Sequence, residues 1–196
     1  MVSPVGAAEE RLRPLTLARN LAWWTSNVEA TDENARLRAA SELAYSDALA
    51  DSDLFAQVEA ALGAGGDAAG TRSLELLYAQ MLPHQIPGEL RARLVELEAD
   101  VESRFSRHRA ALGDREVDEN EIRRILRESD DPDERREAWE ASKTVGAEVA
   151  DDVRELARLR NEAARSLGYR DWFALALATD ELDEESSGRP WPTPTA

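Results

Sequence analysis

The stretch from Asp131 to Asp171 has the most regular apolar pattern in the chain and therefore limits the fold most strongly. Its small and apolar residues recur at steps of three and four, at Ala138, Ser142, Val145, Val149, Val153, Leu156, Leu159, Ala163 and Leu167. This spacing places them on one stripe of an α-helix. Because such a stripe must be covered by another element, the pattern predicts a core helix of an all-α domain.

Both ends of this helix carry residues with a physical reason for their position. Asp131 can accept hydrogen bonds from the free amides of the first turn, and Pro132 fits the first helical position, where its missing N–H costs nothing. Gly168 can adopt the left-handed conformation that ends helices. The sequence thus predicts one long helix over about 131–167, roughly 50 Å in length, with Gly146 as the site of any kink.

The remaining apolar patterns are also helical, and none alternates as in a strand. Helices are expected over about 9–26, 31–50, 51–62, 71–81, 89–112, 118–126 and 171–184. We therefore predict an all-α fold of antiparallel helical hairpins. Its expected parts are a disordered N-terminus over 1–8, a helical region over 9–185 and a disordered, proline-rich tail over 186–196.

The periodicity also predicts which side chains are buried. Of the adjacent Trp23 and Trp24, one is expected in the core and the other against a neighbouring helix or a cleft, because they point about 100° apart. His108 lies near an apolar row and is expected to be a satisfied boundary histidine, not a ligand. The helix over 9–26 has one broad apolar face, and the next helix has another: Leu12, Leu15, Ala18, Leu21 and Ala22 in the first, and Leu37, Ala40, Ala44 and Ala48 in the second.

The charge of the chain limits its partners. It has 40 acidic and 24 basic residues and a formal charge of −16, so nucleic-acid phosphates and anionic membranes would be repelled. It has no cysteine, no apolar run near the roughly 20 residues that span a bilayer, and no signal-peptide pattern at its start. No nucleic-acid or membrane partner is expected, and the predicted location is cytoplasmic.

Candidate catalytic groups do not cluster. Asp130, Asp131 and Asp133 are better explained as charges at a helix start than as an acid–base pair. The Gly63–Gly66 cluster lacks the lysine and the preceding strand of a phosphate-binding loop. An independent acid–base enzyme is therefore the least favoured interpretation.

Three groups of residues resemble a known family. In chain order they are Trp24-Thr25-Ser26-Asn27 followed by Thr31-Asp32-Glu33-Asn34, then Ala138-Trp139 leading to Val145-Gly146, and finally Leu159-Arg160-Asn161-Glu162-Ala163-Ala164-Arg165-Ser166-Leu167-Gly168-Tyr169. The last is the most specific. Together they resemble the N-terminal helical region of angiotensin-converting-enzyme-like peptidyl-dipeptidases and their relatives, thimet oligopeptidase and oligoendopeptidase F. The likeness covers about residues 15–185.

The resemblance implies a zinc metallopeptidase that hydrolyses short peptides, with these helices walling or covering a deep substrate channel. In that family a His-Glu-x-x-His helix and a downstream glutamate bind zinc, and the glutamate of the motif activates water. Neither His84 nor His108 begins such a motif. No residue of this chain is therefore assigned a catalytic, cofactor-binding or metal-binding role, and zinc is expected only in the full-length enzymes.

The resemblance thus predicts a truncated N-terminal part that is inactive alone, with the missing catalytic part as its partner. Apolar surface should remain exposed where that part packs, and Trp23, Trp24, Trp172 and Phe173 are candidates for it. The animal enzymes of the resembling family follow the Gly-Tyr with a Trp-Arg pair linked to chloride, whereas this chain has Trp172-Phe173, so the resemblance does not extend to chloride dependence. The alternative is a non-catalytic helical scaffold or peptide-binding module.

Overall fold

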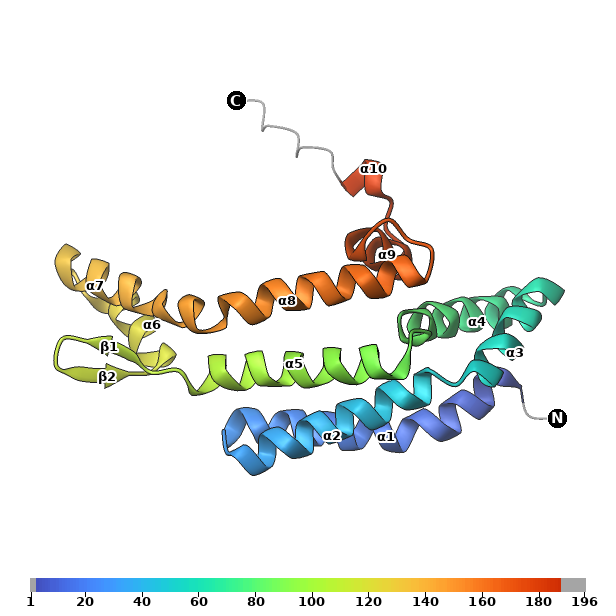
Figure 1. Ribbon diagram of the computed structural model, residues 1–196, viewed down its shortest axis with the longest axis horizontal. Coiled ribbons are helices and arrows are strands. Elements are labelled where there is room, and N and C mark those ends of the chain that lie inside the picture. Colours follow the sequence, from blue (N-terminus) through green and yellow to red (C-terminus); the bar gives the residue numbers. More distant parts are fainter. Residues whose placement is uncertain (1–2, 188–196) are drawn as a thin grey trace.

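The computed structural model describes residues 3–187, which are helical except for one short hairpin (Figure 1). The predicted all-α class is confirmed. The strands β1 (Ala110–Leu112) and β2 (Arg115–Val117) pair antiparallel. The helices are α1 (Pro4–Val28), α2 (Asp32–Leu49), α3 (Ser52–Ala64), α4 (Ala68–Met81), the 3-10 helix η1 (Leu82–His84), α5 (Gly88–Arg107), α6 (Glu119–Glu128), α7 (Pro132–Ser142), α8 (Thr144–Ser166), α9 (Trp172–Thr179) and α10 (Glu184–Ser187). Within residues 3–187, no helix is both long and apolar enough to cross a membrane.

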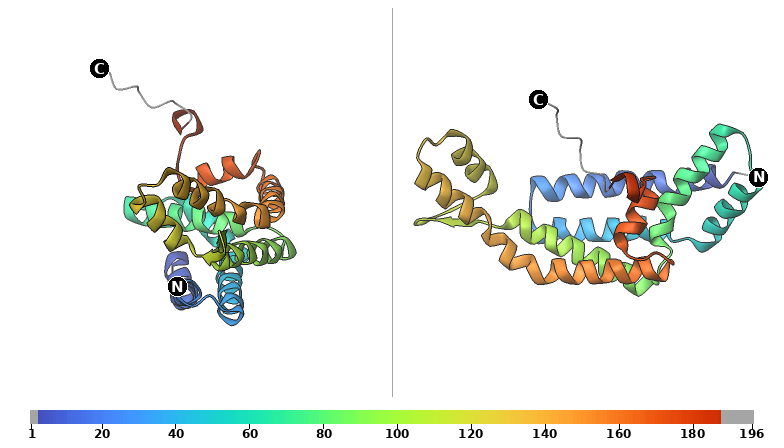
Figure 2. Two further views of the ribbon diagram at one scale, coloured as in Figure 1. Left: turned by 90° about the vertical axis from the view of Figure 1, so that its left-hand side faces the viewer. Right: turned by 90° about the horizontal axis from the view of Figure 1, so that it is seen from above.

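Four long helices form a row. α1, α2, α5 and α8 lie side by side in this order, as the second view in Figure 2 shows. The α3–α4 hairpin packs on α1 at one end, where α9 also contacts α8 and α4. The β1–β2 hairpin, α6 and α7 lie at the opposite end (Figure 1). The two outer helices of the row are therefore α1 and α8.

The apolar core follows these contacts. One cluster joins Leu12 of α1 to Leu49 of α2, Val58 of α3 and Met81 of α4. A second lies between α5 and α8 and includes Leu159. The β hairpin, α6 and α7 enclose a third, smaller cluster. Burial of these stripes between neighbouring helices is what holds the row together.

Helix α2 buries a different stripe from the predicted one. Leu37 is 56% exposed, and Ala40 and Ala44 are exposed as well, whereas Ala48 is buried as predicted. The packed side instead carries Tyr45, because α2 lies between α1 and α5. Apolar periodicity identifies an apolar face of a helix, but it does not show whether another helix packs against that face.

The helix predicted over 131–167 is interrupted. Its first part is α7, α8 begins at Thr144, and the break is at Lys143. The Thr144 hydroxyl donates to the carbonyl oxygen of Ala141 at 2.7 Å and so competes with the helical hydrogen bonds at this point. The prediction of a single long helix is therefore wrong, and the interruption precedes Gly146.

The predicted ends of this region are confirmed. The Asp131 carboxylate accepts a hydrogen bond from the N–H of Asp133 at 2.9 Å, and Pro132 is the first residue of α7. Gly168 follows α8 with φ of +85°, and its N–H donates to the carbonyl of Arg165 at 3.0 Å. Both signals are local, which is why the sequence was sufficient to predict them.

Residues 110–117 form the hairpin where the end of a helix was expected. α5 stops at Arg107, so the predicted helix over 89–112 is too long. Gly113 occupies the first position of the two-residue turn with φ of +60°, which is typical of a type II′ hairpin turn. The expectation that no strand is present is corrected by this one short hairpin.

The N-terminal helix is longer than predicted. α1 begins at Pro4, and the Ser3 hydroxyl oxygen accepts from the N–H of Gly6 at 3.1 Å. Ala8 is buried in the core. The prediction of a disordered N-terminus is therefore wrong for residues 4–8. Of the tail predicted over 186–196, residues 186 and 187 end α10, and residues 188–196, like residues 1–2, lie outside the described part of the chain.

Candidate functional site

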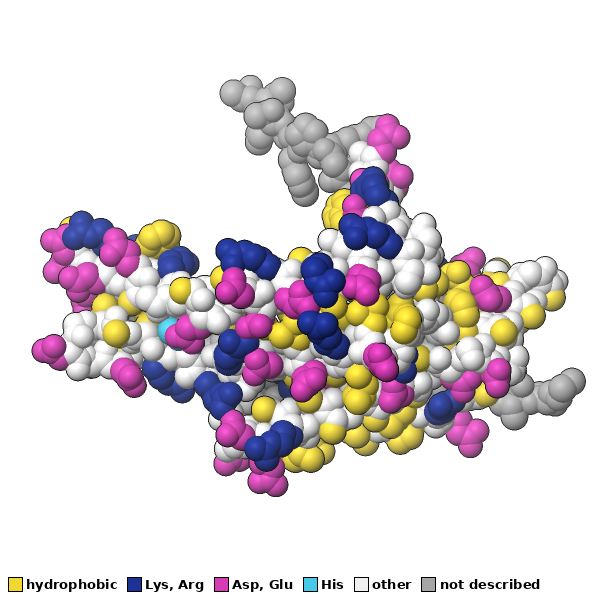
Figure 3. Space-filling view, in the orientation of Figure 1, with side chains coloured by type: hydrophobic (Ala, Val, Ile, Leu, Met, Phe, Trp, Pro, Cys, Tyr) yellow, Lys and Arg dark blue, Asp and Glu magenta, His cyan; other side chains and the backbone are white. Residues whose placement is uncertain are grey.

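Helix α1 has two apolar faces, and only one of them is covered. Its inner face includes Leu12 and packs on α2, α3 and α4. On the opposite side, side chains at steps of four, three and four residues form what we call the outer face of α1: Leu17, Leu21, Trp24 and Val28. These side chains are 71%, 63%, 62% and 69% exposed, respectively. Figure 3 shows the molecule from the opposite side, with α8 in front, and there hydrophobic side chains gather toward the end where α3, α4 and α9 lie.

The outer face of α1 carries no charge of its own. Between Pro14 and Val28 the only charged residue is Arg19. Its guanidinium lies over the ring of Tyr45 at 4.2 Å and within 3.7 Å of the Glu42 carboxylate, both on α2. Arg19 therefore points to the inner side, and three turns of α1 present an uncharged apolar surface. Such surfaces mark sites of interaction.

The four aromatic residues predicted to border exposed apolar surface behave differently. Trp23 and Trp24 are 48% and 62% exposed, so the prediction that one of them packs in the core is wrong. The packed side of α1 instead carries the smaller Ala22 and Ser26, which are half-buried. Phe173 is exposed on α9, whereas Trp172 is half-buried.

The motif residues that carry the family resemblance stabilise helix junctions. The Thr31 hydroxyl oxygen accepts from the N–H of Asn34 at 3.2 Å, and the Asn34 amide donates to the carbonyl of Glu29 at 2.8 Å, which closes the turn between α1 and α2. The Asn161 side-chain oxygen accepts from the N–H of Trp172 at 2.9 Å and thereby joins α8 to α9. These residues are structural in this fold.

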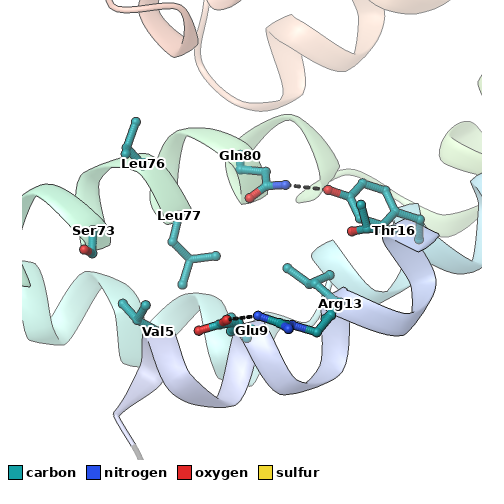
Figure 4. Close-up of a pocket in the computed structure, with 11 residues that line it drawn as sticks. Val5, Glu9, Arg13, Thr16, Ser73, Leu76, Leu77 and Gln80 are labelled. Carbon is teal, nitrogen blue, oxygen red and sulfur yellow. Dashed lines mark hydrogen bonds and ion pairs between the residues drawn. The ribbon is translucent and has the colours of Figure 1, made fainter. Parts of the chain in front are cut away.

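A groove of about 420 Å³ lies between α1 and α4 (Figure 4). Its apolar side chains include Val5, Leu12 and Leu77. A Glu9–Arg13 ion pair of 2.8 Å borders it on α1. This combination can hold an apolar group, but it offers no pair of carboxylates and no nucleophile with a base beside it.

The two histidines are used within the fold. Nδ1 of His84 lies 2.8 Å from the hydroxyl oxygen of Ser46, which is 2% exposed and so inaccessible to a substrate. Burial, with Arg91 and Arg19 nearby, lowers the pKa of His84 from 6.5 to about 4. His84 is therefore neutral at pH 7 and acts as a packing residue.

His108 is the boundary residue that the sequence predicted. It follows α5 directly, and its ring nitrogens lie 2.9 Å from the Glu148 carboxylate and 3.0 Å from the Thr144 hydroxyl. His84 and His108 do not come together, and no group of three His, Cys, Asp or Glu within residues 3–187 is placed to hold a metal ion.

The sequence identifies only part of the outer face of α1: it indicates Trp24 as a candidate for exposed apolar surface, but its periodicity places Leu21 on the same broad face as Leu12. Only the positions of α2, α3 and α4 divide that surface into a covered half and an open half. The fold and the site together define a row of helices with an open apolar edge at α1.

Comparison with known families identifies the class of protein. The family model described as angiotensin-converting enzyme matches residues 4–184. The chain therefore belongs to the angiotensin-converting-enzyme family of peptidases. No match was found among curated proteins. The more specific likeness to thimet oligopeptidase and oligoendopeptidase F stays a prediction.

Proposed function

We propose that this chain is the N-terminal helical part of a zinc metallopeptidase that hydrolyses short peptides, and that it is inactive alone. The observation that carries the proposal is the uncharged outer face of α1 within a chain of the angiotensin-converting-enzyme family. Trp24 belongs both to this face and to the Trp-Thr-Ser-Asn motif. In the proposed assembly, α1 faces the catalytic part, and the row of helices covers the substrate channel.

Burial energetics support this orientation. Fully covering a large apolar side chain contributes about 1.5–3 kcal/mol, so the open side chains of α1 favour a partner that removes them from water. The zinc ligands and the water-activating glutamate would come from that partner, since the sequence has no His-Glu-x-x-His motif. The role left to this chain is to shape and close the channel, which restricts entry to short unstructured peptides.

A reconstitution experiment tests the proposal. The purified chain with added zinc should not cleave short reporter peptides. Adding a separately produced catalytic domain of the same family, which carries His-Glu-x-x-His but lacks these helices, should give cleavage that a chelator abolishes. Leu21→Asp should weaken this gain, and Leu76→Asp, which changes a half-exposed leucine on α4, should not. Chelator-sensitive cleavage by the chain alone would refute its inactivity.

A second candidate function is a non-catalytic peptide-binding module, which the groove between α1 and α4 favours. An amphipathic helical peptide could place apolar side chains on the groove floor, next to the Glu9–Arg13 pair. Leu76 lines this groove, so Leu76→Asp should weaken binding of such a peptide and Leu21→Asp should not. The two variants therefore separate the two functions, because each is the control for the other.

A further inference from the structure

The outer face of α1 has a spacing that is the same in both directions. Its steps of four, three and four residues are symmetric about a point between Ala22 and Trp23. A two-fold axis through this point would place Leu17 opposite Val28 of a second copy, and Leu21 opposite Trp24. Alternating steps of three and four are the spacing that lets two helices pack along a seam.

We infer that two copies of this chain pair antiparallel through the outer faces of their α1 helices. We identify the partner as a second copy because, in the antiparallel orientation, each side chain on the outer face of α1 lies opposite another side chain of the same face. α1 is an outer helix of the row, so a second α1 can approach without displacing α2, α3 or α4. Pairing of the free chain does not depend on the proposed peptidase role.

Charge also favours this arrangement. Two copies of formal charge −16 repel each other over most of their surfaces, and the outer face of α1 is a place where they can meet without opposing like charges. Arg13, one turn before Leu17, is paired with Glu9, and its side chain is 80% exposed. In the antiparallel pair it lies at the level of Asp32 of the other copy, which is paired with Arg107 and is 69% exposed, so opposite charges face each other there. A parallel pair would place Arg13 against Arg13.

The contact is short, and this sets the expected affinity. Four side chains over about three helical turns make an interface smaller than that of most stable complexes, so we expect weak pairing with a dissociation constant on the order of 100 micromolar. Sedimentation of the purified chain should show a monomer of 21.7 kDa when dilute and a species of twice that mass at several hundred micromolar. A monomer throughout this range would overturn the inference.

Matched variants locate the contact. Leu21→Asp places two carboxylates next to the two-fold axis and should leave only monomer, whereas Leu76→Asp on α4 should pair like the unmodified chain. Circular dichroism checks that both remain helical, as expected for residues that are 63% and 50% exposed. Equal loss of pairing in both variants, or in neither, would contradict a contact through α1.

Cysteine cross-linking tests the direction, since the chain contains no cysteine of its own. Leu17→Cys and Val28→Cys chains should form a disulfide when mixed and oxidised. Neither should link to its own copy, because equivalent positions would lie about 16 Å apart along the helix axis, too far for a disulfide. Self-linking of the Leu17→Cys chain would indicate a parallel pair and refute the symmetry argument. If a catalytic domain of the family displaces the second copy, pairing through the outer face of α1 is supported, because both partners would then bind the same face.

Discussion

The two outer helices of the row, α1 and α8, end the fold in opposite ways. α8 buries one apolar stripe that includes Leu159, and its exposed side carries ion pairs: Arg158 lies 2.7 Å from Glu155 and 3.0 Å from Glu162. α1 buries one apolar stripe and exposes another, and between Pro14 and Val28 its one charged residue, Arg19, points to the inner side. The edge at α8 therefore presents paired charges to water, whereas the edge at α1 leaves apolar side chains exposed, as the proposed partner would require.

The difference shows what exposed ion pairs do at an edge. They add little to the stability of the fold, typically below about 1 kcal/mol each. Another protein that covered them would have to remove their hydration, so they oppose association at α8. The side chains on the outer face of α1 have no such hydration to lose, and their burial is favourable. This contrast favours the edge at α1 over the edge at α8 for the proposed association.

The largest expected contrast comes from the same substitution in both helices. Leu159→Ala removes a side chain that is 1% exposed and should lower the free energy of unfolding by about 2–5 kcal/mol. Leu21→Ala removes a side chain that is 63% exposed and should change it by no more than about 0.5 kcal/mol. Urea denaturation of dilute monomer measures both. Equal losses would show that α1 is covered where the structure has it open.

The packed region between α1 and α2 is expected to respond to pH through His84, whose pKa is lowered mainly by burial and further by Arg91 and by Arg19 of α1. Because its folded pKa of about 4 lies below the unfolded value of 6.5, the unfolded chain binds a proton that the folded chain does not. Stability is therefore complete above pH 6.5 and falls as the pH drops toward 4, by about 2 kcal/mol between about pH 7.5 and pH 5.

Denaturation at several pH values measures this loss, and His84→Gln should remove most of it. The lowered carboxyl pKa values of Asp51 and Glu121 act only at lower pH, so they do not obscure the window. A His108→Gln variant is the matched control and should keep the dependence. The same pH slope in the His84→Gln variant and the unmodified chain would contradict the assignment to His84.

These contrasts also show how far the sequence determined the fold. Caps such as Asp131 and Gly168 depend on a few adjacent residues and were predicted correctly. The break at Lys143 was missed because the apolar row continues on both sides of it. The exposure of Leu37 and the open outer face of α1 were missed for a different reason: which of two apolar stripes is covered depends on distant helices. Helix caps could therefore be predicted from the sequence, but which apolar face of a helix is covered by another helix could not.

The smallest expected effect on stability comes from introducing an exposed ion pair on the outer face of α1, like the ion pairs on the exposed side of α8. In a Leu17→Glu, Leu21→Arg double variant, the new side chains are four residues apart with the acid first, which stabilises a helix by about 0.2–0.5 kcal/mol. The unfolding free energy of the dilute monomer should therefore stay within about 0.5 kcal/mol of the original. Self-pairing should disappear in sedimentation, because four charges would have to be desolvated at the contact. Retained pairing would show that the apolar character of this edge is not what brings two copies together.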